Sequence, residues 1–308
     1  PPRSTLFPYT TLFRSWYSGT VIYRPVWLTL LDPIDIEPWD LFIYTPEWSD
    51  REATLTVEAA VAATAPLTET LAIRTVLLDP RGKIADERTC PIGFVQKECG
   101  SENTCSKQKS VTGSETGSES DTSTGSDYKQ MSYNDGKHSF ILDLLVKNPA
   151  SWTPDEPSLY TLQLFRVTGD HETLLRETTC GLREVAISAQ DGLTLNGVPL
   201  KLRGGCIHHD NGPLGAASFA AAEERKVRLL KAAGYNAVRC AHNPPAPAFL
   251  DACDRLGLLV MDELCDCWQE GKNPYDYHMA FERDWRKDLD AMVRRDRNHP
   301  SVIIWSTG

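Results

Sequence analysis

Two patterns of hydrophobic and polar residues divide the chain. Between residues 35 and 188, short runs rich in β-branched and apolar residues are separated by Pro, Gly and Asp. Four of these runs have lengths typical of strands, namely 53–61, 72–78, 139–146 and 159–167. Because repeated short strands of this kind pack as two facing sheets, residues 35–188 are predicted to form a β-sandwich. Residues 16–30 also alternate apolar and polar side chains, which predicts a further strand.

After residue 188, strand-like runs alternate with helix-like runs. Apolar strands are predicted at 200–204, 236–240, 258–262 and 302–305. Amphipathic helices are predicted between them, at 219–234, 246–256 and 280–296. Apolar strands that alternate with amphipathic helices indicate a parallel sheet covered by helices, so this part of the chain is predicted to be α/β.

Two segments do not follow either pattern. Residues 98–134 are mostly Ser, Thr, Gly, Asp, Glu and Lys, and such a composition buries too little apolar surface to offset the entropy of ordering. They are predicted to be a disordered loop inserted into the sandwich. Residues 1–15 repeat Thr-Leu-Phe and resemble a translated sequencing adaptor, so we leave them out of the fold prediction. A natural irregular segment is the alternative.

Composition and charge narrow the class of function. The chain of 308 residues carries 32 Lys and Arg against 42 Asp and Glu, a net charge of −10. Phosphate contacts need clustered basic residues, so a nucleic acid or an anionic membrane is not expected as a partner, and an uncharged substrate fits better. No apolar run has the length of a membrane span, and no signal peptide is recognised. Nine unevenly spaced Cys do not indicate a disulfide framework. The protein is therefore predicted to reside in a reducing cytoplasm.

Polar residues follow each of the four strands predicted after residue 188. These ends are 206–211 (Cys-Ile-His-His-Asp-Asn), 239–243 (Arg-Cys-Ala-His-Asn), 262–263 (Asp-Glu) and 306–308 (Ser-Thr-Gly). In a (β/α)₈ barrel such ends converge on the active site. Helix caps or satisfied core histidines are the alternative for His208 and His242. A Cys/His metal site is a second alternative, but the chain lacks a CxxC pair, and no metal is predicted.

The same stretches carry a family resemblance. Residues 202–204 (Leu-Arg-Gly), 208–209 (His-His), 234–239 (Gly-Tyr-Asn-Ala-Val-Arg), 242–244 (His-Asn-Pro), 254–263 and 295–306 look like glycoside hydrolase family 2. That family includes β-galactosidases, β-glucuronidases and β-mannosidases. Residues 16–24 resemble the end of its N-terminal jelly-roll domain.

The resemblance implies the domain order and the reaction. It implies a jelly-roll remnant at 16–34, an immunoglobulin-like β-sandwich at 35–188 and the first half of a catalytic (β/α)₈ TIM barrel at 189–308. A complete barrel needs about 250 residues. It also implies retaining hydrolysis of a β-linked carbohydrate by two carboxylates. Both are expected beyond Gly308, so no residue of this chain is named as catalytic, and the chain alone is expected to be inactive.

The resemblance assigns the remaining site residues to substrate binding. His208 and His242 are implied to hydrogen-bond sugar hydroxyls. Arg239 and Glu263 match a charged pair that either keeps a catalytic carboxylate ionised or braces the barrel mouth. Trp268 is expected to stack on a sugar or to pack in the core, and Asp266 is a further candidate. Some relatives carry a Glu-x-His magnesium pair where this chain has 267–269 (Cys-Trp-Gln), so neither a metal nor another cofactor is expected.

The expected function is therefore part of a β-galactosidase, which as a full-length enzyme could be a homo-oligomer. A β-glucuronidase or a β-mannosidase of the same family is the first alternative, because the sugar-specific pocket would lie in the other half of the barrel. A non-catalytic carbohydrate-binding fragment is the second alternative.

Overall fold

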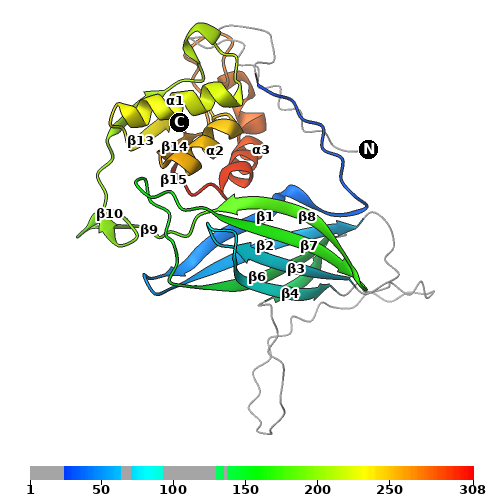
Figure 1. Cartoon of the computed structure of the whole chain (residues 1–308). Coiled ribbons are helices and arrows are strands. Elements are labelled where there is room, and N and C mark those ends of the chain that lie inside the picture. The colour runs from blue at the N-terminus through cyan, green and yellow to red at the C-terminus, as the bar shows by residue number, and fades with distance from the viewer. Residues whose placement is uncertain (1–23, 64–70, 93–129, 135–136) are drawn as a thin grey trace, which may run out of the picture.

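The structure is a computed structural model that describes residues 24–63, 71–92, 130–134 and 137–308. They form two lobes, a β-sandwich and a parallel sheet covered by helices, which we call the sandwich lobe and the α/β lobe (Figure 1). Residues 1–15, residues 16–23 of the predicted jelly-roll remnant and residues 98–129 of the predicted insert lie outside the described residues. In the part of the chain that is described, no helix is long and apolar enough to cross a membrane.

The sandwich lobe consists of two four-stranded antiparallel sheets. One has the order β1 (Ile34–Trp48), β2 (Glu52–Ala63), β6 (Lys137–Lys147) and β5 (Gln130–Asn134). The other has the order β4 (Ile84–Ile92), β3 (Leu71–Leu78), β7 (Tyr160–Thr168) and β8 (His171–Cys180). The predicted strands 53–61, 72–78, 139–146 and 159–167 are confirmed as β2, β3, β6 and β7.

Strand β6 shows how the pattern of side chains builds the core of this lobe. Phe140, Leu142, Leu144 and Val146 are buried, and the residues between them are more exposed. Successive side chains of a strand point to opposite faces, so this alternation directs every second residue between the sheets. Each large apolar side chain buried in this way contributes about 1.5–3 kcal/mol.

Two predictions made for this part of the chain need correction. The last five residues of the predicted insert 98–134 form β5, an edge strand in which Gln130 lies opposite Ile141 and Asn134 opposite Lys137. Backbone hydrogen bonds to a neighbouring strand do not depend on side-chain polarity, so composition did not reveal this strand. The strand predicted at 16–30 is wrong over its described part. Residues 24–33 belong to no strand, and Trp27, Leu28 and Leu30 are exposed. Alternation produces a strand only where a partner strand is available.

A small antiparallel sheet connects the two lobes. Its strands are β9 (Val185–Ser188), β10 (Gly192–Leu195) and β11 (Val198–Pro199). Asn196 and Gly197 form the turn between β10 and β11, with φ of 52° and 70°. Both values lie in the left-handed region that an Asn-Gly hairpin turn requires.

The α/β lobe contains a parallel sheet whose strands follow chain order. The strands are β12 (Gly204–Ile207), β13 (Ala237–Cys240), β14 (Leu259–Glu263) and β15 (Val302–Ser306). The connections contain a short 3₁₀ helix, η1 (Gly212–Leu214), and the helices α1 (Ala220–Ala232), α2 (Pro247–Leu256) and α3 (His278–Asp296). The predicted helices and a helix-covered parallel sheet are confirmed. The arrangement is consistent with part of a TIM barrel.

The first strand of this sheet begins later than predicted. Residues 200–203 lie outside the sheet, and β12 starts at Gly204, opposite Ala237. A Cβ atom at position 204 would lie 1.8 Å from the Ala237 carbonyl oxygen, so only glycine fits this pairing. The apolar side chain of Leu202 suggested a buried strand at 200–204. In the structure this side chain is 42% exposed, so it does not mark a buried strand. Cys206, in this strand, is exposed.

The sandwich lobe packs against the amino ends of the parallel strands. Arg183 donates to the Val302 carbonyl oxygen at the start of β15, and Trp152 Nε1 donates to the Asp254 carbonyl oxygen at 2.8 Å. Asn298 binds the backbone of β1, accepting from the Ile43 N–H and donating to the Leu41 carbonyl oxygen. The carboxyl ends of the strands therefore point away from the sandwich, as Figure 1 shows.

Candidate active site

Glu263, the last residue of β14, is the centre of the polar cluster at the carboxyl ends. Its side chain is fully buried, and it accepts hydrogen bonds from Arg239 Nε at 2.5 Å and Arg239 Nη2 at 2.9 Å. Arg239 lies on the neighbouring strand β13. A paired guanidinium–carboxylate contact is among the strongest in proteins, so this pair joins the two strands at their carboxyl ends.

Two further groups complete the surroundings of the Glu263 carboxylate. His242 Nδ1 lies 3.0 Å from Oε1, and Ser306 Oγ donates to Oε2 at 3.0 Å. Each oxygen thus has two partners, which is the full accepting capacity of a carboxylate. Burial would raise the pKa of Glu263, but the hydrogen bonds from Arg239, His242 and Ser306 outweigh it, so the pKa lies below its usual value. Glu263 is therefore an ionised carboxylate that holds other side chains in place.

The Glu263 carboxylate also orients the His242 ring. A carboxylate beside Nδ1 favours a proton on that nitrogen, which makes Nε2 the acceptor of the neutral imidazole. The His208 ring, which follows β12, lies edge-on to it with 5.5 Å between ring centroids. Asp266 Oδ1 lies 3.6 Å from His242 Nδ1 and 2.8 Å from Lys272 Nζ. The sequence-predicted residues His208, Arg239, His242, Glu263 and Asp266 are thus brought together.

Trp268 lies at the edge of this cluster rather than in a core. Its side chain is 53% exposed, and its Nε1 donates to the Thr307 carbonyl oxygen at 2.7 Å. The ring stacks on Phe281 of α3 with 6.3 Å between centroids. Within the described residues Trp268 is therefore not packed in a core, and contact with a sugar stays a prediction.

Two residues of the cluster were not among the predicted site residues. Ser306 lies opposite Glu263 in the register of β14 and β15, and its position at the end of a predicted strand was the signal that could have identified it. Lys272 lies on the loop between β14 and α3. No periodicity indicates where a loop residue points, so the sequence carried no signal for it.

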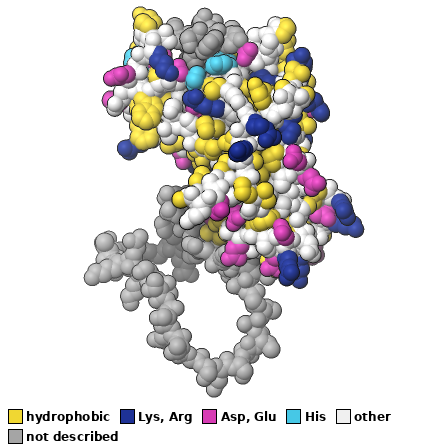
Figure 2. Space-filling model, turned by 90° about the vertical axis from the view of Figure 1, so that its left-hand side faces the viewer, with side chains coloured by type: hydrophobic (Ala, Val, Ile, Leu, Met, Phe, Trp, Pro, Cys, Tyr) yellow, Lys and Arg dark blue, Asp and Glu magenta, His cyan; other side chains and the backbone are white. Residues whose placement is uncertain are grey.

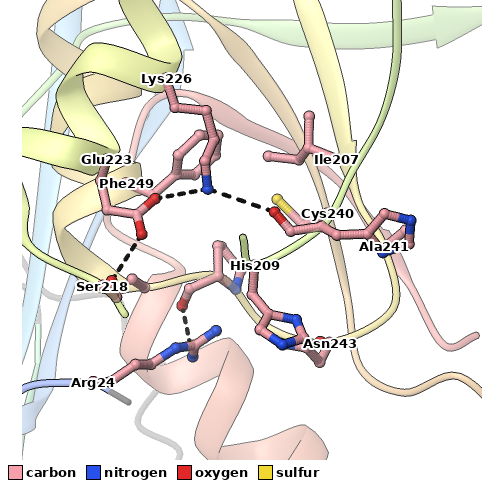
Figure 3. A pocket seen from close by; sticks show the side chains of 13 residues that line it. Arg24, Ile207, His209, Ser218, Glu223, Lys226, Cys240, Ala241, Asn243 and Phe249 are labelled. Atoms are coloured by element: carbon pink, nitrogen blue, oxygen red, sulfur yellow. Dashed lines mark hydrogen bonds and ion pairs between the residues drawn. The ribbon is translucent and has the colours of Figure 1, made fainter. Parts of the chain in front are cut away.

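A small pocket lies next to His208. His208, His209, Glu223, Lys226 and Arg24 are among the residues that line it (Figure 3). Lys226 Nζ lies 3.1 Å from a Glu223 oxygen, and Ser218 donates to the other oxygen at 2.7 Å. The cavity measures about 20 Å³, which is room for about one water molecule and far too little for a sugar. The His242 side chain is 28% exposed, and histidine side chains reach the surface of the α/β lobe (Figure 2).

The metal alternative finds no support in the residues that the structure describes. They contain no group of three or more His, Cys, Asp or Glu side chains arranged to hold a metal ion. Cys206 instead accepts a weak hydrogen bond from Arg239 Nη1 at 3.8 Å, and Cys265 and Cys267 are buried.

Comparisons with known proteins agree with this arrangement. The family model described as "Glycosyl hydrolases family 2, TIM barrel domain" matches residues 185–308, and the one described as "Glycosyl hydrolases family 2" matches residues 93–183. The beta-galactosidase BoGH2A of Bacteroides ovatus is 36% identical over 95% of this chain, which covers 30% of that protein. The chain spans less than a third of the length of the curated relatives it matches.

Solved structures show the same similarity. A glycosyl hydrolase family 2 member from Bacteroides cellulosilyticus is 37% identical, with a TM-score of 0.79 over 95% of this chain and 33% of its own. A beta-glucuronidase from Bacteroides uniformis is 25% identical, with a TM-score of 0.67 over 89% of this chain and 29% of its own.

Proposed function

Because the chain belongs to glycoside hydrolase family 2, we propose that it supplies the sugar-binding half of the active site of a retaining β-galactosidase. The observation that carries this proposal is the pair His208 and His242 at the carboxyl ends of the parallel strands, with His242 held on the buried carboxylate of Glu263. The name of the Bacteroides ovatus relative supports galactose as the sugar.

The two histidines are suited to binding a sugar. A neutral imidazole carries one donor and one acceptor nitrogen, so each ring can bind hydroxyl groups in either sense. Asp266 adds a carboxylate beside His242, and the half-exposed Trp268 ring offers an apolar face to a sugar. Arg239 and Glu263 brace this surface, which is the second of the two roles predicted for the pair. In this proposal Glu263 does not touch the sugar.

The same geometry bears on the catalytic carboxylates. A retaining glycosidase needs two carboxyl groups about 5–5.5 Å apart, one as acid/base and one as nucleophile. The Glu263 oxygens are fully engaged, and Asp266 is paired with Lys272. These contacts support the proposal that both catalytic carboxylates of the whole enzyme lie beyond Gly308. The chain of 308 residues is expected not to hydrolyse an aryl β-glycoside.

A panel of nitrophenyl glycosides tests the proposal. The full-length enzyme, expressed from the extended coding sequence, should hydrolyse the β-galactoside with retention of configuration, and the chain of 308 residues should not. Preference for the β-glucuronide or the β-mannoside would overturn the choice of sugar. Turnover by the purified chain above the uncatalysed rate would overturn the placement of the carboxylates.

Variants of the full-length enzyme test the role of the histidines. His242→Ala is expected to lower kcat/KM about 100-fold, because a sugar hydroxyl loses its hydrogen bond to the imidazole ring that Glu263 orients. His171→Ala, at an exposed position on β8, is the matched control and should leave kcat/KM unchanged. Equal effects of the two substitutions would contradict the assignment.

A further inference from the structure

The loop that carries His242 contains two consecutive prolines, Pro244 and Pro245, and connects β13 to α2. Proline has no backbone N–H, but its carbonyl oxygen still needs a donor when it is removed from bulk water. Asn243 Nδ2 donates to the Pro244 carbonyl oxygen at 3.1 Å, and two arginines supply the other donors. Arg24 Nη2 donates to the Pro244 carbonyl oxygen at 2.9 Å and Nη1 to that of Pro245 at 3.3 Å, and Arg295 Nη2 donates to Pro245 at 2.9 Å.

Both arginines come from parts of the chain that are remote from the loop. Arg295 lies in the last turn of α3. Arg24 lies at the start of the segment 24–33, which runs from the α/β lobe down to the sandwich and enters β1 (Figure 1). The segment therefore links the sandwich lobe to the end of the α/β lobe that bears the site.

The Arg295 side chain is itself fixed from behind. Its Nε and Nη2 each lie 2.6 Å from an oxygen of Asp296, whose side chain is fully buried. Asp262, the neighbour of Glu263, is also fully buried. Burial and the nearby Asp296 charge raise the pKa of Asp262 well above its usual value. The Arg295–Asp296 pair is then a compensated ion pair and a rigid support.

Arg24 occupies a different side of the same loop. Figure 3 shows Lys226 and Arg24 entering the small pocket from opposite sides, with His209 between them. Its guanidinium binds both proline carbonyls, so it fixes the backbone only two residues after His242. A planar fork with several donors can do this, whereas a lysine ammonium is a single compact charge.

We infer that Arg24 and Arg295 are positioning residues for His242, which hold the Pro244–Pro245 backbone so that the His242 ring stays on Glu263. The segment that contains Arg24 then positions a residue of the site, in addition to connecting the two lobes. The sugar-binding role of His242 rests on the proposed function, but the positioning of its loop does not.

The test compares Arg24→Met with Arg228→Met in the chain of 308 residues. Arg228 is an exposed arginine of α1 whose side chain is 63% accessible, so it matches the change in charge and size. Hydrogen exchange of the loop amides that carry a proton, at 241–243 and 246, should become about tenfold faster in Arg24→Met, the effect of losing about one charge-assisted hydrogen bond. The ¹⁵N signals of the His242 imidazole should shift away from the Nδ1-protonated form. Arg228→Met should change neither.

Further measurements separate positioning from a general loss of structure. Buried Cys240 and Cys253 should stay protected from thiol reagents in Arg24→Met, which shows that the lobe is still folded. If they are labelled, Arg24→Lys replaces Arg24→Met, and loop hydrogen exchange and the His242 ¹⁵N signals are measured on that variant. In the full-length enzyme, Arg24→Met should raise KM about tenfold and change kcat less. Loop exchange and His242 signals identical to the unmodified chain would overturn the inference. A full-length enzyme without glycosidase activity would contradict the proposed function alone, because both loop measurements are independent of substrate.

Discussion

Replacing Glu263 by glutamine tests the central feature of the site. The substitution keeps the shape of the side chain but removes the charge that Arg239 binds through two nitrogens. Breaking a buried ion pair costs about 3–5 kcal/mol. Arg239 is 37% exposed and can be hydrated when its partner is lost, so we expect a cost of about 2–3 kcal/mol, confined to the α/β lobe.

Buried cysteines allow each lobe to be followed separately. Cys240 and Cys253 lie in the α/β lobe, Cys90 and Cys180 lie in the sandwich lobe, and all four are buried. Burial raises the pKa of the Cys240 and Cys253 thiols well above the usual value and that of Cys180 to about 12. Because the thiolate is the reactive form, labelling reports opening of the surrounding structure. We call these four residues the reporter thiols.

In Glu263→Gln, the two reporter thiols of the α/β lobe should be labelled about 30-fold faster or more, as a free energy of about 2–3 kcal/mol requires. The two thiols of the sandwich lobe should change less than about twofold. A double-mutant cycle with Arg239→Met should give a coupling energy of at least about 1 kcal/mol. A change in stability below about 0.5 kcal/mol, or equal labelling of both lobes, would refute the reasoning.

The pH dependence of stability, measured by urea unfolding, supplies an independent check. The pKa of Glu263 is lowered on folding, so its stabilisation is present above its unfolded pKa of about 4.3 and is lost as the pH falls through the lower folded value. The unmodified chain should therefore lose part of its advantage over Glu263→Gln as the solution is acidified below about pH 4. A constant difference between the two proteins down to pH 2 would contradict an ionised Glu263.

Three further outcomes follow from contacts at the amino ends of the parallel strands. Burial opposes protonation of His299, but its contact with Asp254 and nearby acidic charges raise its pKa, so its stabilisation is lost as the pH rises above about 6.5. His299→Gln should abolish this pH dependence, measured as the labelling rate of the reporter thiols in the α/β lobe after correction for thiol ionisation. Gly257→Ala should lower the free energy of unfolding in urea by about 3 kcal/mol or more, because φ is +74° and the new Cβ would lie 2.1 Å from a backbone oxygen. The control Gly234→Ala has a φ of +86° but open space around the new Cβ, so it should cost about 1 kcal/mol. Trp152→Ala, which empties a fully buried site between the lobes, should cost about 3–5 kcal/mol and speed labelling of all four reporter thiols.

Much of the fold could be predicted from local pattern. The alternation through Phe140, Leu142 and Leu144 predicted β6, and helical spacing predicted α1, α2 and α3. Both patterns follow from which side chains leave water, and that depends on a few neighbouring residues. The polar ends of four parallel strands also predicted that Arg239, His242 and Glu263 would meet, because such ends lie at one edge of a sheet.

Other features depended on which distant segments pair. The composition of Gln130–Asn134 did not distinguish an edge strand from a loop, and the backbone pairing with β6 decided it. The start of β12 at Gly204 depended on the close approach of Ala237. In the site, the engagement of both Glu263 oxygens required the register of β14 against β15, which brings Ser306 to the carboxylate.

The sequence by itself therefore determined the three long helices, several core strands and the strand ends at which the polar side chains gather. Only the tertiary structure decided that Glu263 orients His242, and that Arg24 binds carbonyl oxygens 220 and 221 residues away. The physical reason is the range of the interactions. Burial leaves a periodic mark on neighbouring residues, whereas a hydrogen bond between remote segments depends on how the lobes pack and leaves no mark in the local sequence.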